Sequence, residues 1–318
     1  GMYTVKLQDQ RIDFEKIDEA CHYVPYGRNV WEGRMERFDL TSLKCYRALR
    51  DAKRLERSLG TLGGGNHFIE IDQASNGTYY LIIHSGSRNL GKQVAEYYQQ
   101  VAIELHMGKE EYAAKKAEII KTYKSTGKSK EIQAALVELK KEYESKILDI
   151  PNSLCWLYGQ TFKDYLHDIE ICQEFARKSR EKMAQIILKR TGMTTEESFH
   201  TIHNYIDTEE MILRKGAIAA HKGEKVLIPV NMRDGSILAI GKGNDEWNQS
   251  APHGAGRLMS RSKARETVDI EEYKRSMNGI YTTSVNEYTL DEAPMAYKSL
   301  EDIIDVVSES VDIVEVMK

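Results

Sequence analysis

Residues 62–91 read LGGGNHFIEIDQASNGTYYLIIHSGSRNLG, and this stretch sets the first expectation for the fold. The β-branched and aromatic run Thr78–Ile83 follows an Asn76-Gly77 turn and lies opposite Phe68–Ile71, a pattern that predicts an antiparallel hairpin. Glycine-rich and polar loops stand at both ends of these strands. The stretch therefore predicts a β-hairpin whose flanking loops can approach a ligand closely.

The chain outside this hairpin divides into a helical zone and a second strand-rich zone. From about residue 92 to 190 the sequence is rich in Lys and Glu, and apolar residues recur at helical spacing. One stripe comprises Ile132, Leu136, Leu139, Tyr143 and Ile147, and a second comprises Ile169, Cys172, Phe175, Ser179, Met183 and Ile186. After residue 200 strands return, and Ala217–His221 with Val226–Val230 predicts another hairpin. We expect an α+β fold, a single mixed domain over 1–318 with mainly antiparallel sheets and a helical insertion at roughly 92–190.

The composition bounds the class of protein. The chain has 318 residues, of which 41% are hydrophobic and 30% are charged, as in ordinary globular proteins. Its formal net charge of −4 argues against a surface coated with basic charge, although it leaves room for a local basic patch. No C-x-x-C spacing, apolar run of about 18 residues or secretory leader is visible, so we expect a cytoplasmic protein.

The loop before the first strand has two readings. Gly63, Gly64 and Gly65 allow the backbone to approach a ligand, and Asn66, His67 and Glu70 then supply an amide, an imidazole and a carboxylate. The alternative is a plain β-turn followed by a half-buried strand. The loop after the hairpin pairs His84 with Arg88, a residue suited to a phosphate, although a histidine at a strand end is often structural.

Two further histidines stand in informative settings. In the strand-like segment 199–205, His200 and His203 are separated by an odd number of residues, so their rings point apart, and only His203 is a candidate. His253 stands between proline and glycine and precedes Arg257, Arg261, Lys263 and Arg265. A neutral imidazole there suits attack on a phosphate. The alternative is a helix-start loop whose arginines pair with acidic neighbours. Together the loops indicate metal-assisted phosphoryl or nucleotidyl transfer.

The order of these motifs resembles that of the RtcB-type RNA-splicing ligases. The motifs are GGGNHFIE at 63–70, HSGSR at 84–88, HNY at 203–205, RKGA at 214–217, WNQSAPHGAGRLMSR at 247–261 and DEAPMAYK at 291–298. The resemblance covers nearly the whole chain. It implies a GTP- and Mn²⁺-dependent ligase that joins an RNA 3′-phosphate or 2′,3′-cyclic phosphate to a 5′-hydroxyl, as in tRNA halves or damaged RNA.

The resemblance also implies roles for single residues. His253 is similar to the histidine that takes GMP from GTP, His67 and His84 to ligands of one manganese, and His203 to a ligand of a second. We therefore expect these four histidines to converge in the fold. The segments that resemble the guanylate-binding ones comprise Asn66, His67, Phe68, Ile69, Glu70, His203, Asn204, Pro229, Val230, Asn231, Met232, Ser236, His253, Gly254, Ala255 and Gly256.

The chain departs from the family pattern in three places. Family members carry an Asp-x-x-Cys element followed by Gly-Met, and this chain begins at Gly1-Met2, so we expect zero or one metal, at His67 and His84. Pro229-Val230-Asn231-Met232 stands where the family has Pro-Gly-Ser-Met. The chain ends at Lys318, before the family's usual tail with its guanine-contacting lysine.

Three functional hypotheses remain open at this point. The first is an RNA ligase. The second is a guanylyltransferase that caps RNA 3′-phosphate ends without sealing them. The third is a shortened, catalytically impaired homologue that binds a nucleotide or RNA. Incubation with labelled GTP and manganese separates the third hypothesis from the other two.

Overall fold

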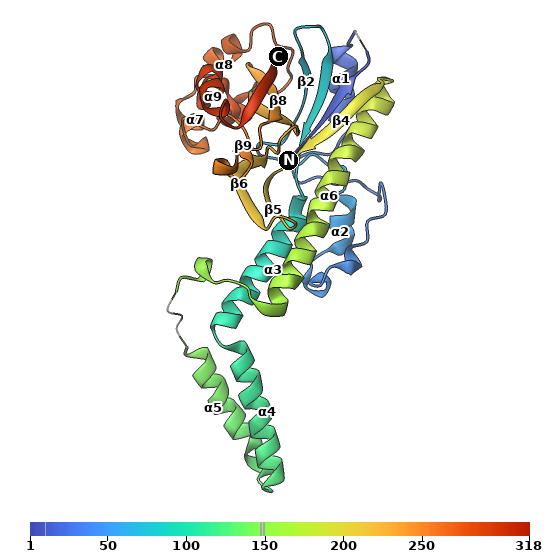
Figure 1. Cartoon of the computed structure of the whole chain (residues 1–318). Helices are drawn as coiled ribbons and strands as arrows, with labels where there is room; N and C mark the ends of the chain where they lie inside the picture. The colour runs from blue at the N-terminus through green and yellow to red at the C-terminus, as the bar shows by residue number, and fades with distance from the viewer. Residues whose placement is uncertain (10, 147, 149) are drawn as a thin grey trace. The chain divides into compact units, whose positions relative to one another are not determined.

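A computed structural model describes residues 1–318 except 10, 147 and 149 (Figure 1). The helices are α1 (Phe14–His22), α2 (Ala52–Arg57), α3 (Arg88–His106), α4 (Lys109–Ser125), α5 (Ile132–Glu144), α6 (Gly159–Thr191), α7 (Arg261–Thr267), α8 (Ile270–Ser276) and α9 (Leu300–Val307). The strands are β1 (Met2–Leu7), β2 (Phe68–Gln73), β3 (Tyr79–His84), β4 (Thr195–Thr201), β5 (His203–Asp207), β6 (Ile212–Ala219), β7 (Lys225–Asn231), β8 (Gly235–Gly241), β9 (Ser250–Pro252) and β10 (Val311–Met317).

The chain divides into two compact units. The first comprises Gly1–Phe38, Lys53–Arg88 and Cys172–Lys318, and the second comprises Asp39–Ala52 and Asn89–Ile171. The helical insertion that the sequence predicts at roughly 92–190 overlaps the second unit, but its last part belongs to the first unit. Helix α6 contributes residues to both units.

Antiparallel sheets form the first unit. One sheet has the strand order β2-β3-β1-β4, and β2 pairs with β3 from Phe68 opposite His84 to Gln73 opposite Tyr79. This pairing confirms the hairpin predicted from residues 62–91, and Gly77 takes the positive φ of 86° that its turn requires. The described residues form two further sheets, of order β10-β8-β7 and β5-β6-β9.

The alternation of side chains sends the two faces of the first sheet to different cores. Leu81 and Ile83 pack on one face with Met183 and Ile187 of α6. Tyr80 and Ile82 point the other way. On that second face they form a core with Met2, Leu227, Leu238 and Met317, which come from β1, β7, β8 and β10. The same second face carries four more side chains of β2 and β3, which therefore point toward the sheet β10-β8-β7. They are His84, Phe68, Glu70 and Asp72.

One strand pairing predicted from the sequence is wrong. The turn at His221–Glu224 exists, with the amide of Glu224 donating to the carbonyl of His221, but the segments it joins do not pair with each other. Strand β6 pairs with β5 and β9, and β7 pairs with β8. Each segment pairs instead with the strand on its other side in sequence, β6 with β5 and β7 with β8. A turn between two strand-like segments therefore does not by itself decide which neighbours pair.

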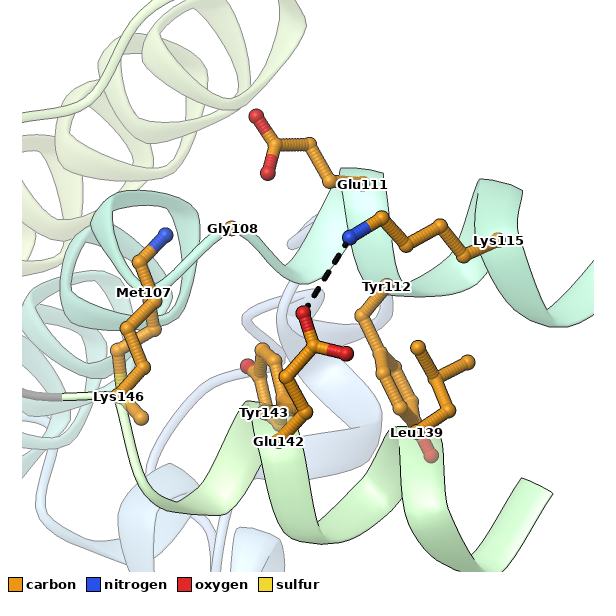
Figure 2. Close-up of a pocket in the computed structure, with 9 residues that line it drawn as sticks. All are labelled: Met107, Gly108, Glu111, Tyr112, Lys115, Leu139, Glu142, Tyr143 and Lys146. Carbon is orange, nitrogen blue, oxygen red and sulfur yellow. Dashed lines mark ion pairs between the residues drawn. The ribbon is translucent and has the colours of Figure 1, made fainter. Parts of the chain in front are cut away.

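The second unit consists mainly of helices. Helices α4 and α5 pair through Tyr112 and Tyr143, whose ring centroids lie 4.6 Å apart, and through an ion pair between Lys115 and Glu142 at 3.5 Å (Figure 2). Leu139 of the predicted stripe is buried in α5, and Ile147 lies outside the described residues.

A buried carboxylate organises the rest of this unit. Asp168 of α6 accepts hydrogen bonds from the amides of Lys44 and Cys45, at 2.8 and 3.0 Å, and from the hydroxyl of Tyr98 at 2.8 Å. These bonds fasten the segment 39–52 and α3 to α6.

The second helical stripe predicted from the sequence lies in α6, where Cys172, Phe175, Ser179 and Met183 are buried. The predicted α+β fold with antiparallel sheets is confirmed. Within the described residues, no helix combines the length and apolarity needed to cross a bilayer.

Candidate active site

The glycine loop before β2 is held tightly in place. The amide of Gly27 donates to the carbonyl of Gly63 at 2.8 Å, and the Arg88 guanidinium donates to the carbonyl of Gly27 at 2.8 Å. Gly63 has φ +95°, and a Cβ there would overlap both the Arg88 guanidinium and the His67 ring. Glycine is therefore required at this position for His67 and Arg88 to pack where they do. Arg88, which the sequence suggested for a phosphate, has its guanidinium bound within the protein, to Gly27 and Thr61.

His84 and His203 approach each other at the end of β3. The Nδ1 atom of His84 lies 2.8 Å from the carbonyl oxygen of Asn66, so Nδ1 carries the proton and Nε2 keeps a lone pair. The Nε2 atoms of His84 and His203 lie 2.9 Å apart. In the neutral pair His203 donates through Nε2, which leaves a lone pair on its buried Nδ1. That atom has no hydrogen-bond partner among the described residues.

His253 extends the row of imidazoles. The ring centroids of His67 and His84 lie 5.6 Å apart, those of His84 and His203 5.1 Å, and those of His203 and His253 4.8 Å. The Nδ1 atom of His253 lies 2.8 Å from the carbonyl oxygen of Gly216 and donates to it, so Nε2 holds the lone pair. Sequence positions 67, 84, 203 and 253 thus converge, as we expected.

Burial keeps three of these rings neutral. It lowers the pKa of His67 to about 4, with help from the positive charge of Arg88, and it lowers the pKa of His203 to about 2. Burial also lowers the pKa of His84 well below its usual value. Neutral imidazoles present lone pairs, which a metal ligand requires.

The donor set fits a cation only in part. In the described part of the chain, no group of three or more His, Cys, Asp or Glu side chains is placed to hold a metal ion. The 2.9 Å between the Nε2 atoms of His84 and His203 is nevertheless close to the roughly 3 Å that separates two nitrogens bound at right angles, each about 2.1 Å from an octahedral ion. The best-placed pair of donors is therefore His84 with His203, once the Nε2 proton of His203 moves to its Nδ1, whereas the resemblance paired His84 with His67.

The strand β2 places two carboxyl groups beside β8. The Ser236 hydroxyl donates to Glu70 at 3.3 Å, and Asp72, two residues further along β2, shares the same face. Burial and the charge of Asp72 raise the pKa of Glu70, and burial raises the pKa of Asp72 to about 7. Glu70 and Ser236 are both among the residues that the resemblance assigns to guanylate, while Asp72 was missed. Its signal was the two-residue spacing from Glu70.

The segments at 229–232 and 253–256 meet through their backbones. The amide of Ala255 donates to the carbonyl of Pro229 at 3.1 Å, and a Cβ at Gly254 would lie 3.2 Å from that carbonyl oxygen. Of the remaining residues predicted here, Gly256 accepts a hydrogen bond at its carbonyl from the amide of Lys298. Ala255 and Val230 are buried in the core beside β7, and Phe68 packs on His84.

Three other predicted guanylate-binding side chains are used within the protein. The amide group of Asn231 bonds to Asp234, and the Met232 sulfur accepts from the Tyr273 hydroxyl. Ile69 packs in the core formed with α6. The position of Val230, where the family pattern has glycine, needs no positive φ in this chain.

Asn204 shapes the strand that carries His203. It has φ +53°, and the pairing of β5 with β6 shifts register between His203 and Tyr205. Its side-chain oxygen accepts from the amide of Gly216 at 2.6 Å. Asn204 therefore positions the carbonyl that holds His253. Gly216 was not singled out from the sequence, although the RKGA motif contains it.

One protein-family model matches most of this chain. The model described as tRNA-splicing ligase RtcB matches residues 32–318. The chain belongs to the RtcB family. All four histidines lie inside the matched range.

Curated members of the RtcB family are similar over most of this chain. The RNA-splicing ligase RtcB of Escherichia coli (strain K12) is 28% identical over 279 residues, which cover 82% of this chain and 60% of that protein. The tRNA-splicing ligases RtcB of Nanoarchaeum equitans and Aeropyrum pernix are 30% and 28% identical, over 79% and 80% of this chain and 56% of each relative. The chain thus spans three fifths or less of these relatives.

Of the histidines outside the row, His200 and His221 of this RtcB-family chain have other partners. His200 of β4 stacks on Tyr3 with a 4.4 Å centroid distance, and its Nε2 lies 3.1 Å from Glu181. His221 pairs with Glu210 and Glu224. The choice of His203 over His200 agrees with this placement, although residues 199–205 form two strands, β4 and β5, in different sheets.

The arginines after His253 pair with acidic neighbours. Arg261 and Arg265 contact Asp291 at 2.8 and 3.2 Å, and Arg261 contacts Glu292 at 2.6 Å. Ser260 caps α7 with its hydroxyl. These arginines are therefore paired, as in the second reading of this segment, while the imidazole of His253 is held separately by the carbonyl of Gly216.

Proposed function

We propose that this chain is an RNA ligase that works through a guanylylated histidine, with GTP as the nucleotide donor. The observation that carries the proposal is the orientation of His253. Its Nδ1–H is held by the carbonyl of Gly216, so Nε2 presents a lone pair at the end of the row of imidazoles. A neutral nitrogen held in one tautomer is suited to attack on phosphorus.

In the proposed first step, Nε2 of His253 attacks the α-phosphorus of GTP. A nitrogen–phosphorus bond forms, the bond to the bridging oxygen breaks, and pyrophosphate leaves. Ser236 with Glu70, and the backbone around Gly254, are the candidates to hold the guanylate. In the subsequent steps the GMP passes to an RNA 3′-phosphate, and a 5′-hydroxyl displaces it.

Mn²⁺ bound by His84 and His203, with His67 nearby, would withdraw charge from the phosphate oxygens. The neutral state of the rings and the spacing of the two Nε2 atoms support this assignment. The likeness to proteins named RNA-splicing and tRNA-splicing ligases supports RNA as the substrate.

The test is incubation with α-labelled GTP and Mn²⁺, followed by denaturing electrophoresis. The wild-type chain should acquire covalent label, and His253→Ala should acquire none. His200→Ala and His221→Ala serve as controls because both rings lie outside the row, and both should label normally. Label that persists in His253→Ala would refute the role of this residue.

A further inference from the structure

The hairpin of α4 and α5 has little internal core. None of the described residues of α4 is buried, and in α5 only Leu139 is. The two helices touch through the Tyr112–Tyr143 stack and the Lys115–Glu142 pair, beside a hollow lined also by Met107 and Lys146 (Figure 2). A helical hairpin that buries so little apolar surface contributes little to stability, so its surface is the feature to explain.

The charge of this hairpin differs in sign from that of the whole chain. Residues 109–146 carry ten lysines against seven glutamates, hence a net charge of +3, whereas the chain carries −4. The excess is concentrated at the turn. Between Glu118 and Glu131 there are four lysines and no acidic residue, namely Lys121, Lys124, Lys128 and Lys130, which we call the basic tip.

The lysines of the basic tip differ in their ion pairing from four of the six other lysines of the same hairpin. All four lysines of the basic tip are exposed, and none makes an ion pair within the described part of the chain. Four other lysines of the hairpin are paired, Lys109 with Glu104, Lys115 with Glu142, Lys140 with Glu144 and Lys141 with Glu138. Four unpaired ammonium groups within ten residues form a site for an extended polyanion.

We propose that the basic tip binds the phosphate backbone of RNA. An acidic protein partner is the less favoured occupant, because protein interfaces are anchored by apolar and aromatic side chains, and the described residues of 119–130 expose no large one. Lysine without arginine indicates contact with phosphates as point charges rather than reading of bases. The choice of RNA as the polyanion rests on the proposed function, but the binding itself needs neither GTP nor His253.

The test measures binding of a fluorescein-labelled RNA hairpin of about 20 base pairs to the full chain by anisotropy, without GTP or metal, over a series of salt concentrations. The variant K121Q/K124Q/K128Q/K130Q should bind about tenfold or more weakly at 0.1 M salt. Its slope of log affinity against log salt should fall by about 3. A matched control, K109Q/K115Q/K140Q/K141Q, removes the same charge from the same hairpin and should keep most of the affinity and slope.

A third variant guards against loss of folding. K121R/K124R/K128R/K130R keeps the charge and should bind as the wild type does, with circular dichroism checking helicity for all three. The proposal is overturned if the basic-tip variant binds RNA like the wild type, or if the matched control loses as much affinity and slope. GMP labelling of the same proteins separates the two proposals, since failure to label in the wild type would refute the histidine chemistry and leave the RNA result standing.

Discussion

The backbone amide and the ring Nδ1 of His253 both contact the carbonyl oxygen of Gly216, at 3.3 and 2.8 Å. This oxygen fixes the position of the residue and the tautomer of its ring together. Gly216 has φ +69°, and its own amide is held by Asn204. The reactivity of His253 should therefore depend on the conformation of a residue 37 positions away in sequence.

Gly216→Ala should slow formation of the GMP adduct by about tenfold or more. An L-residue at positive φ costs about 1 kcal/mol or more, so the peptide will rotate and move the carbonyl away from Nδ1. Gly223→Ala is the matched control, because Gly223 has φ +83° in a turn outside the row of histidines. Single-turnover labelling with GTP measures both. Equal rates for the two variants would mean that the Gly216 carbonyl does not govern His253.

Gly63→Ala should destabilise the first unit by about 1–3 kcal/mol more than Gly65→Ala does. Both glycines have positive φ, so the backbone strain is matched. A Cβ at Gly63 overlaps the Arg88 guanidinium and the His67 ring, whereas a Cβ at Gly65 meets nothing within 4 Å. Urea unfolding gives the free energies. If Gly63→Ala lost no more free energy of unfolding than Gly65→Ala does, Arg88 would have to move aside freely despite its hydrogen bonds to Gly27 and Thr61.

The parts of the fold that the sequence predicts well are those specified locally. The Asn76-Gly77 turn and the alternation on either side of it define the hairpin of β2 and β3. The stripe from Cys172 to Met183 likewise defines the buried face of α6. In each case, neighbouring residues carry both the propensity and the pattern.

The parts that fail depend on a choice between partners that the local pattern does not decide. The turn at His221–Glu224 predicts a hairpin, but β7 pairs with β8 because that pairing joins a core shared with β10 and α9. The sequence leaves open whether the arginines after His253 are free or paired, because Asp291, the partner of Arg261, lies 30 residues away. Convergence of the four histidines was expected through the resemblance, since no local rule relates positions 67 and 253.

Asp168→Asn should destabilise the second unit by about 1–3 kcal/mol at pH 7. The carboxylate is fully buried and accepts from Lys44, Cys45 and Tyr98, and an amide cannot accept all of these bonds. Asp164→Asn, one turn earlier on α6, is the control, since it loses only a contact with Gln160. Thermal unfolding of the three proteins compares them.

The same pair of proteins gives a pH test. Burial opposes ionisation of Asp168, but hydrogen bonds from His167, Lys44, Cys45 and Tyr98 outweigh it and hold its pKa below the usual value. A carboxyl whose pKa is lowered on folding contributes stability above its unfolded pKa of about 4 and loses it as pH falls through the folded pKa. The difference in stability between wild type and Asp168→Asn should therefore shrink below about pH 4. A constant difference down to pH 2 would contradict this account.

Asp72 should show the opposite dependence, because burial raises its pKa to about 7. Between about pH 4, where the unfolded chain ionises, and pH 7, the folded state retains a proton that the unfolded state loses. Wild-type stability should therefore fall with pH across this window. In Asp72→Asn this contribution is absent, so the variant should gain stability relative to wild type from pH 4 to pH 7 and keep that gain above pH 7.

The control is Asp312→Asn, at an exposed position of β10, which should show no such trend. Urea unfolding at intervals of one pH unit supplies the data. A difference between wild type and Asp72→Asn that is the same at pH 4 and pH 8 would mean that Asp72 is ionised in the fold at both pH values. The pair with Glu70 would then have to be stabilised by a charge or donor beyond Ser236.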